Sequence, residues 1–375
     1  MAGVYIHIPF CKQACYYCDF HFSTSQDLKD DLVSALCVEM EMQKEYLEGE
    51  PIETIYFGGG TPSLLSAHHM QNLLDAIHKN FVTNNPEVTL EANPDDLSPE
   101  NLAMLKAVGV NRLSIGIQSF DDAILRFLNR VHSSSDALHC LKLARNAGFD
   151  NISIDLIYAI PGQDNNLLKR NIEKAIAIAP EHISAYSLTV EEKTVFGQQR
   201  KKGILPMETE EAAATQMEIL MDELRNAGFD QYEISNFCKP GFYSRHNSSY
   251  WQQKKYLGIG PSAHSYNGFS RQSNISNNPL YIKSISQSKI PSQVEVLSQA
   301  NKINEYLFTT LRTTWGCNLN YLLKQLGHDL LKENYWTLNT LLKHELIIIK
   351  NDLMKLTQKG KFLADKIASD LFVKE

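Results

Sequence analysis

The sequence predicts an α/β protein built on a partial (β/α)6 TIM-like barrel and completed by a smaller, α-helical C-terminal domain. Three observations support this fold class. The first two thirds of the chain alternate short β-rich runs with amphipathic helical stretches six times. Strands that alternate with helices form a parallel sheet, and no break in the strand-helix order interrupts these six units, which favours an open barrel. The remainder, from about residue 279, is mainly helical.

Each predicted strand is a short run rich in apolar and β-branched residues, as expected for strands buried on both faces of a sheet. The runs cover residues 4–8, 54–57, 88–92, 112–117, 152–158 and 182–188. Helical patterns lie between them, among them 67–80 and 99–108. The second of these follows Ser98, a favourable N-cap, and ends at Gly109, a favourable C-terminal glycine.

The pattern divides the chain into three parts. Residues 1–195 form the barrel core, and residues 196–278 form a cap and closing segment with a helix over 209–227 and an aromatic, glycine-rich stretch. Residues 279–375 form the C-terminal domain, which is predicted to be helical, with a hairpin turn at Asn351 and Asp352 and a last helix over 358–372. Helices followed by a terminal hairpin indicate a winged-helix-like domain.

Composition narrows the class of protein. The chain has 375 residues, of which 43% are hydrophobic and 21% charged, and its net charge is −7. No apolar run approaches the roughly 20 residues of a membrane span, and the N-terminus does not resemble a secretory signal, so we expect a soluble, cytoplasmic protein. The negative charge argues against a nucleic-acid partner, because phosphate binding needs clustered lysine and arginine.

The cysteines indicate metal ligation. The chain has seven, an odd number, and three of them, Cys11, Cys15 and Cys18, form a C-x3-C-x2-C motif directly after the first strand. A cubane iron-sulfur cluster normally takes four thiolates, so three leave one iron open. The amino and carboxylate groups of S-adenosylmethionine can chelate that iron. The alternative is a structural zinc site in which His7 or His21 completes a Cys3His set.

Other polar or glycine-rich residues also follow predicted strands. The segment GGGTP follows Phe57, Glu91 ends the third strand, and Gln118 follows the fourth. Because the carboxyl ends of parallel strands meet at one edge of a sheet and carry its ligands, we expect these residues and the cysteines to form a single site.

Several motifs occur together in the order of one known family. They are YIHIPFCKQACYYCDF, FGGGTPSLL, LEANPD, RLSIGIQSF, LNRVH, IDLIYAIPGQ and GIGPSAH. Over residues 4–270 the chain resembles the oxygen-independent coproporphyrinogen III oxidases and their relatives, which have the radical SAM type of partial barrel. The oxidases carry a fourth cysteine where this chain has Phe20, and they have an N-terminal extension where only ten residues precede Cys11. The chain instead resembles the heme chaperone branch, with its H-N-x-x-Y-W motif at His246, Asn247, Tyr250 and Trp251.

The resemblance implies a set of contacts to S-adenosylmethionine beside a [4Fe-4S] cluster on the three cysteines. These contacts are Tyr5, Tyr17, Gly59, Gly60, Thr61, Glu91, Gln118, Arg130 and Asp155. Glycine is suited to GGGTP because backbone must approach the ligand closely, although an ordinary turn capped by Thr61 is an alternative. An ion pair among Glu91, Arg130 and Asp155 is the alternative for those three.

The heme candidates lie in the cap segment. A neutral imidazole is a common axial ligand of heme iron, which makes His246 the first candidate, with Asn247, Tyr250 and Trp251 beside it and aromatic rings available for stacking. His264 is the second candidate. The alternative is that His246 is satisfied by ordinary hydrogen bonds.

Three functions follow from these features. The first is a heme chaperone that binds heme and delivers it to hemoproteins, some at a membrane, using the cluster and S-adenosylmethionine; the resemblance also allows a homodimer and peripheral membrane association. The second is an oxygen-independent coproporphyrinogen III oxidase. The third is a winged-helix protein that recruits a partner and carries a structural metal site. No residue is assigned a catalytic role.

Overall fold

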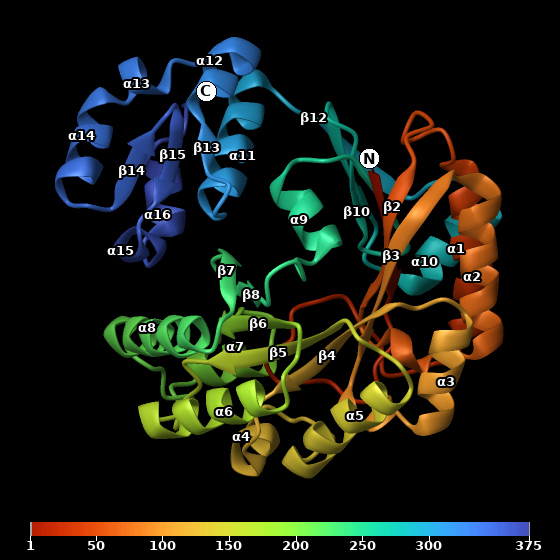
Figure 1. Ribbon diagram of the computed structural model, residues 1–375. Helices are drawn as coiled ribbons and strands as arrows, with labels where there is room; N and C mark the ends of the chain where they lie inside the picture. The colour runs from red at the N-terminus through yellow and green to blue at the C-terminus, as the bar shows by residue number, and fades with distance from the viewer. Residues whose placement is uncertain (1, 375) are drawn as a thin grey trace.

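The computed structural model describes residues 2–374 and contains a twelve-stranded sheet whose centre is formed by the six predicted strands (Figure 1). They run parallel, each hydrogen-bonded to the next in chain order. In the described residues β1 pairs with β9 and β6 pairs with β8, so the barrel does not close on itself and is partial, as predicted. The six strands are β1 (Ala2–Ile8), β2 (Ile52–Gly59), β3 (Thr83–Ala92), β4 (Arg112–Gln118), β5 (Ile152–Tyr158) and β6 (His182–Ser187).

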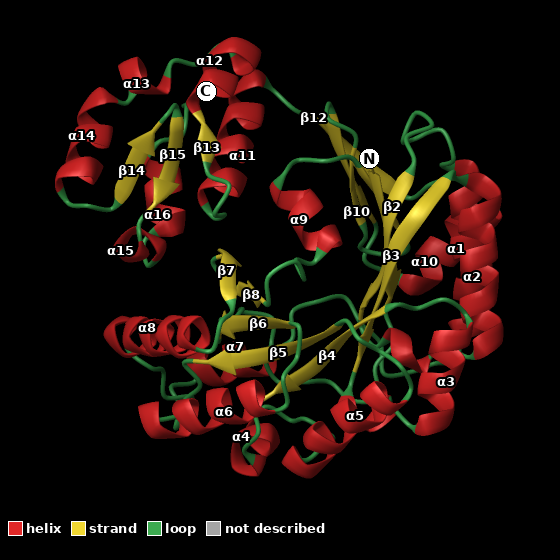
Figure 2. Ribbon diagram, viewed as in Figure 1, coloured by secondary structure: helices red, strands yellow, loops and turns green. Residues whose placement is uncertain are grey.

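Helices cover the outer side of this sheet (Figure 2). The predicted helix termini are confirmed for α2 and α3, where Ser66 and Ser98 accept hydrogen bonds from the backbone N–H three residues later. The helices are α1 (Lys29–Met42), α2 (Ala67–Asn80), α3 (Pro99–Ala107), α4 (Asp122–Phe127), α5 (Ser134–Asn146) and α6 (Asn165–Ala177), with 3-10 turns η1 (Pro62–Leu64) and η2 (Pro94–Asp96).

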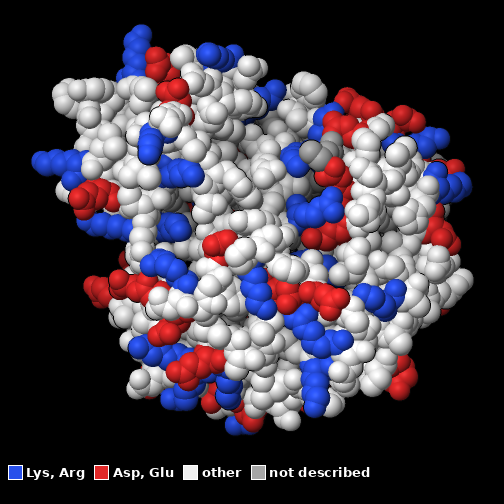
Figure 3. All heavy atoms as spheres, in the orientation of Figure 1, with Lys and Arg blue, Asp and Glu red and all other residues white. Residues whose placement is uncertain are grey.

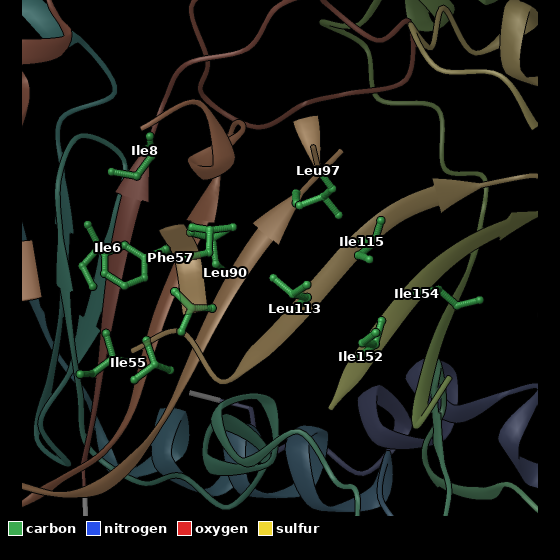
Figure 4. Close-up of a cluster of buried hydrophobic side chains, with 14 of the residues drawn as sticks. Ile6, Ile8, Ile55, Phe57, Leu90, Leu97, Leu113, Ile115, Ile152 and Ile154 are labelled. Carbon is green, nitrogen blue, oxygen red and sulfur yellow. The ribbon is translucent and has the colours of Figure 1, made fainter. Parts of the chain in front are cut away.

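Alternation along the strands separates an apolar outer face from a polar inner face. Ile6, Phe57, Leu90, Ile115 and Ile154 point outward and are fully buried in the main core (Figure 4). Because successive side chains point to opposite faces, their neighbours line the inside of the partial barrel. These inner residues include Tyr5, which is in register with Tyr56, as well as Glu91 opposite Ser114 and Asp155 opposite Ser184. The barrel interior is therefore polar and aromatic.

The chain between residues 195 and 278 adds strands to both edges of the sheet. β8 and β7 extend it antiparallel beyond β6, while β9 joins β1 in parallel and β10 and β11 continue from there. The short helix α9 lies against β1 and β2 between these two additions. The elements are α7 (Val195–Lys201), α8 (Glu210–Asn226), β7 (Asp230–Glu233), β8 (Asn236–Cys238), α9 (Arg245–Trp251), β9 (Tyr256–Ile259), β10 (His264–Tyr266) and β11 (Ser270–Asn274).

Two elements then return to the barrel. α10 (Asn278–Ser286) packs on α1, and β12 (Ser292–Val296) pairs with β11 at the end of the large sheet. The predicted helical stretch from residue 279 is therefore wrong over β12. Its sequence SQVEV alternates polar and apolar residues as a strand does, and β11 provides the hydrogen-bonding edge.

The rest of the chain has its own hydrophobic core and a three-stranded sheet in the order β13-β15-β14. A helix, a strand, further helices and a hairpin whose second strand pairs with that first strand make a winged-helix arrangement. The elements are α11 (Gln299–Leu311), β13 (Cys317–Asn318), α12 (Leu319–Leu326), α13 (Leu330–Glu333), α14 (Tyr335–Lys343), β14 (Ile347–Lys350), β15 (Leu353–Leu356), α15 (Gln358–Lys361) and α16 (Ala364–Asp370).

The predicted last helix over 358–372 is two helices, α15 and α16. Gly360 in the first lies so close to the Leu346 carbonyl that a Cβ would stand 1.9 Å from its oxygen. This contact holds α15 against the end of the hairpin, and the chain turns at Leu363 before α16 begins. The periodic pattern in the sequence continues across that turn and does not reveal it.

The surface matches the composition. Lysine and arginine are interspersed with aspartate and glutamate on the face shown in Figure 3. None of the helices described in the structure is long and apolar enough to cross a membrane.

Candidate active site

The cysteine loop lies at the carboxyl end of β1 and is held there by its neighbours. The backbone N–H of Gly60 donates to the Ile8 carbonyl at 2.9 Å, and that of Thr61 donates to the Phe10 carbonyl at 2.7 Å. On the other side, the Asn129 side chain donates to the Ala14 carbonyl at 2.8 Å. Cys11, Cys15 and Cys18 are free thiols that are partly exposed. The loop therefore presents three thiols from a fixed backbone.

Two side chains from distant segments donate to the sulfur atoms, Thr61 from the segment after β2 and Arg130 from the loop between α4 and α5. Thr61 Oγ1 lies 3.6 Å from Cys11 Sγ, and an Arg130 guanidinium nitrogen lies 3.4 Å from Cys15 Sγ. Donors of this kind stabilise thiolates and tune a cluster bound to them. The donor set thus fits a [4Fe-4S] cluster.

The GGGTP segment needs glycine at two positions. Gly59 has φ +108°, and a Cβ there would stand 2.5 Å from the His7 ring. A Cβ on Gly60 would stand 2.8 Å from backbone atoms of Ile8 and Phe10. Thr61 precedes η1, but its side chain makes no capping hydrogen bond. Its hydroxyl instead donates to Cys11 Sγ and accepts from the Asn93 side chain. The alternative of a turn capped by Thr61 is therefore wrong.

Glu91 and Asp155 are carboxyl groups inside the barrel. Glu91 accepts from the Tyr56 hydroxyl at 2.8 Å and from the Gly59 N–H at 3.1 Å, and burial raises its pKa. Burial, together with the nearby negative charge of Glu91, raises the pKa of Asp155 to about 7. In the described residues Arg130 forms no ion pair with either carboxylate; its guanidinium instead bonds to Asn93 and the Gly116 carbonyl, which contradicts the ion-pair alternative.

Arg130 and Gln118 retain unpaired polar atoms. Arg130 donates to the Asn93 side chain at 2.5 Å and to the Gly116 carbonyl at 2.7 Å, but within residues 2–374 its buried Nε has no partner. Gln118 ends β4 in the left-handed region, with φ +66°, and its side chain makes no hydrogen bond to the described residues. Buried donors without partners are uncommon in proteins, so the Arg130 Nε is suited to a polar ligand. Gln118 is half-buried, and its amide is also available. Tyr17 is half-buried beside Cys15 and Arg130.

His246 is placed differently from the other predicted contacts. It is 1% exposed, its Nδ1 lies 2.7 Å from Thr54 Oγ1, and its Nε2 lies 2.7 Å from the Tyr250 hydroxyl. Its ring stacks on Tyr56 at 4.9 Å. The prediction that His246 binds heme iron is therefore not supported by its geometry, since both ring nitrogens are already engaged. Asn247 lies in the first turn of the same helix, with its backbone N–H bonded to Ser244.

A large cavity separates this end of the barrel from the winged-helix domain. Its volume is about 900 Å³, and aromatic rings dominate its wall. It contains four predicted residues, Tyr5, Tyr250, Trp251 and His264. The sequence did not single out its other rings, namely Tyr256, Tyr266, Phe308 and Phe372. Phe20 also lines it and is 72% exposed, which is unusual for phenylalanine.

Two charged residues were also missed. Arg271 lines the same cavity and forms an ion pair with Glu305 at 3.0 Å. Arg112, at the start of β4, is 1% exposed, and its Nε has no partner among the described residues. An arginine inside an apolar strand was a usable signal for Arg112, whereas no local pattern marks Arg271.

Comparison with known proteins identifies the family. The model of the radical SAM superfamily matches residues 5–175. A heme chaperone HemW from Bacillus subtilis is 39% identical over 98% of both chains. Another from Mycobacterium tuberculosis is 34% identical over 98% of this chain and 94% of that protein. The chain belongs to the HemW family of radical SAM proteins.

The fold of the HemW family is also seen in a solved enzyme structure. The coproporphyrinogen III oxidase HemN from Escherichia coli superposes with a TM-score of 0.86 and 23% identity, covering 99% of this chain and 90% of the enzyme. At this identity the likeness concerns the fold alone. Membership of the radical SAM superfamily implies a [4Fe-4S] cluster and S-adenosylmethionine. This implication favours the cluster over the zinc alternative for the three cysteines.

Proposed function

We propose that this protein is a heme chaperone that holds heme in the aromatic cavity and delivers it to hemoproteins. The observation that carries the proposal is His264, an imidazole on the cavity wall whose ring has no hydrogen-bond partner among the described residues. Relatives over the whole chain bear the name heme chaperone, which supports the same function.

The cavity has the properties of a porphyrin site. Its volume of about 900 Å³ lies within the range of pockets that enclose sizeable organic ligands. Phe20, Trp251 and Phe308 offer apolar faces for the macrocycle, and Arg271 offers a guanidinium for a propionate. Partial burial and the charge of Arg271 lower the pKa of His264, so the ring is neutral at pH 7 and its nitrogen lone pair is available.

Other histidines near the cavity are less available. His7 is bonded to the Tyr5 hydroxyl at 3.1 Å and to the His21 carbonyl at 2.9 Å. His21 is hydrogen-bonded to Asn278 at 2.7 Å. Both ring nitrogens of His246 are hydrogen-bonded, one to Thr54 and the other to Tyr250. We therefore assign heme ligation to His264 rather than His246. Tyr250 and Trp251 remain as predicted ring contacts to the porphyrin.

The S-adenosylmethionine contacts keep the assignment that the resemblance implies. These residues lie inside the barrel or around the cysteine loop, and they are Tyr5, Tyr17, Gly59, Gly60, Thr61, Glu91, Gln118, Arg130 and Asp155. The unpaired Arg130 Nε and the Gln118 amide support this set. When bound, the cluster supplies an electron donor beside the sulfonium; the chain's own residues orient the ligand.

The proposal includes acceptors but names none. Acceptor hemoproteins, association with a membrane surface and a homodimer follow only from the family resemblance, and a cytoplasmic location is expected from the sequence. The oxidase function is not favoured, because Phe20 stands where the oxidases have their fourth cysteine.

The test is heme titration of the cluster-loaded protein, followed by absorption spectroscopy. We expect a histidine-type Soret band in the wild type, and His264→Ala should change that band and weaken heme affinity about tenfold or more, which corresponds to a loss of about 1.4 kcal/mol or more. His139→Ala, an exposed histidine on α5, is the matched control and should change neither.

The oxidase function is tested in parallel. The reconstituted protein is supplied with coproporphyrinogen III, S-adenosylmethionine and a reductant. Formation of protoporphyrinogen at many turnovers per chain would overturn the chaperone function; no product together with stable heme binding supports it.

A further inference from the structure

We propose that His246 is a positioning residue that couples occupation of the aromatic cavity to the S-adenosylmethionine site, so that heme and S-adenosylmethionine change each other's affinity. The inference rests on the proposed function, because it needs both ligands to bind. It gives the H-N-x-x-Y-W motif a role other than iron ligation.

Tyr250 links the cavity to His246. The Tyr250 ring lines the cavity, and its hydroxyl lies 2.7 Å from His246 Nε2. The two rings meet edge to face at 4.8 Å. A porphyrin that packs on Tyr250 therefore acts directly on the hydrogen-bond partner of the imidazole.

Tyr56 links His246 to Glu91. The imidazole stacks on Tyr56 with 4.9 Å between centroids and 25° between planes. The Tyr56 hydroxyl donates to Glu91 at 2.8 Å, and the second Glu91 oxygen accepts from Gly59 in the GGGTP segment. Any shift of the imidazole changes the position of the donor that orients this carboxylate.

The packing leaves little room for independent movement. A Cβ on Gly3 would stand 2.6 Å from Thr54 Oγ1 and 3.2 Å from the His246 ring. A Cβ on Gly58 would stand about as close to Tyr5, Tyr56 and Glu91, at 2.9 to 3.0 Å. Glycines at both strand positions thus allow a dense stack, and densely packed side chains transmit displacement instead of absorbing it.

The imidazole also has two hydrogen-bonding patterns. A neutral ring donates from one nitrogen and accepts at the other, while the hydroxyls of Thr54 and Tyr250 can each donate or accept. The same atoms therefore accommodate either tautomer. A ligand group that bonds to the Tyr250 hydroxyl selects one of them, and that selection is the discrete change that coupling requires.

The experiment measures the Kd of S-adenosylmethionine for the cluster-loaded full chain, anaerobically, with and without one equivalent of hemin. We expect hemin to change this Kd about fivefold or more in the wild type. Because coupling between two bound ligands is reciprocal, S-adenosylmethionine should change the Kd of hemin by the same factor.

Two variants remove single atoms of the connection. Tyr250→Phe deletes the hydroxyl that bonds to His246 Nε2, and Thr54→Val deletes the one that bonds to Nδ1. In either variant the Kd of S-adenosylmethionine with hemin should equal the Kd without hemin, so that their ratio is about one. Tyr243→Phe is the matched control, because Tyr243 precedes α9 and its hydroxyl has no partner in the described residues. It should retain the wild-type ratio.

The outcomes separate the two proposals. A wild type that binds both ligands with a ratio of one overturns the coupling but leaves the chaperone function intact, and so does a Tyr250→Phe variant with an unchanged ratio. A wild type that binds no hemin overturns the chaperone function itself. The cluster spectrum and the melting temperature of each variant show whether the comparison is between folded, loaded proteins.

Discussion

The cysteine loop and helix α9 both carry a compact motif, but they differ in whether the polar atoms around the motif already have hydrogen-bond partners. Around the loop, donors from two distant segments, Thr61 and Arg130, point at sulfur, and Arg130 Nε has no partner among the described residues. At α9, both nitrogens of His246 are bonded, the ring is stacked, and glycine makes room for it. The first region is arranged to receive a ligand, whereas the second is arranged to hold its own side chains in place.

A motif therefore shows which atoms a site has, but not whether they are free. For the three thiols, which lie within eight residues, the donors Thr61 and Arg130 come from distant parts of the chain. His246, in contrast, has a hydrogen-bond partner within its own helix. Tyr250 lies four residues later on the same helix face, and its hydroxyl reaches the His246 ring.

The largest effect is expected at the loop. Cys15→Ala removes one of three thiolates and should reduce bound iron from about four atoms per chain to near zero after reconstitution, since two thiolates hold a cubane poorly. Iron and sulfide assays measure this. Cys37→Ala is the matched control because Cys37 lies on α1 and bonds only to the Asn72 carbonyl. Full cluster content in Cys15→Ala would contradict the ligand assignment.

A smaller effect of a different kind is expected at α9. His246→Ala leaves Thr54 and Tyr250 without their partner and opens a cavity beside Tyr56, so it should lower the free energy of unfolding by about 2–4 kcal/mol. Urea unfolding measures this, and iron content should stay at the wild-type level. If His246→Ala instead kept its stability and lost the histidine-type Soret band, the two regions would be alike and His246 would be a ligand.

The sequence predicted the barrel because its signals are local. Each strand is a short apolar run with polar residues at its end, and the helices carry capping residues such as Ser66 and Ser98. The cysteines, GGGTP and Glu91 follow directly from their places at strand ends. Strand β12 escaped prediction because it is polar and short, and the break between α15 and α16 depends on a contact with Leu346 that is distant in the chain.

The cavity could not be predicted because its wall comes from segments far apart in the sequence. Phe20, Tyr256 and Phe308 meet only after the sheet has curved and the winged-helix domain has been placed beside it. For the same reason the sequence ranked His246 above His264: the motif was visible, but the hydroxyls of Thr54 and Tyr250 that engage it were not.

The smallest effect is expected at Asp155, in the region that is arranged to receive a ligand. There the free energy of unfolding should depend on pH. Burial raises the pKa of Asp155 to about 7, above the value near 4 of an unfolded chain. The folded protein therefore binds this proton more tightly, so the contribution of Asp155 to stability is fully present below pH 4 and is lost as pH rises through 7. Asp155→Asn should remove that loss and make the ligand-free protein more stable at pH 8 by roughly 2 kcal/mol, a value reduced because the side chain is partly open to the barrel interior.

Urea unfolding of the wild type and Asp155→Asn at several pH values between 4 and 8 measures this difference. Ser184→Ala is the matched control, because it removes the hydroxyl that bonds the same carboxyl and leaves the titrating group in place. It should keep the pH dependence, with a midpoint that moves upward since that bond lowers the pKa of Asp155. Equal stability of the wild type and Asp155→Asn at pH 8 would mean that the carboxylate carries no burial cost. Its place in the barrel would then resemble that of His246, already satisfied by its neighbours, instead of that of Arg130, which retains a free atom for a ligand.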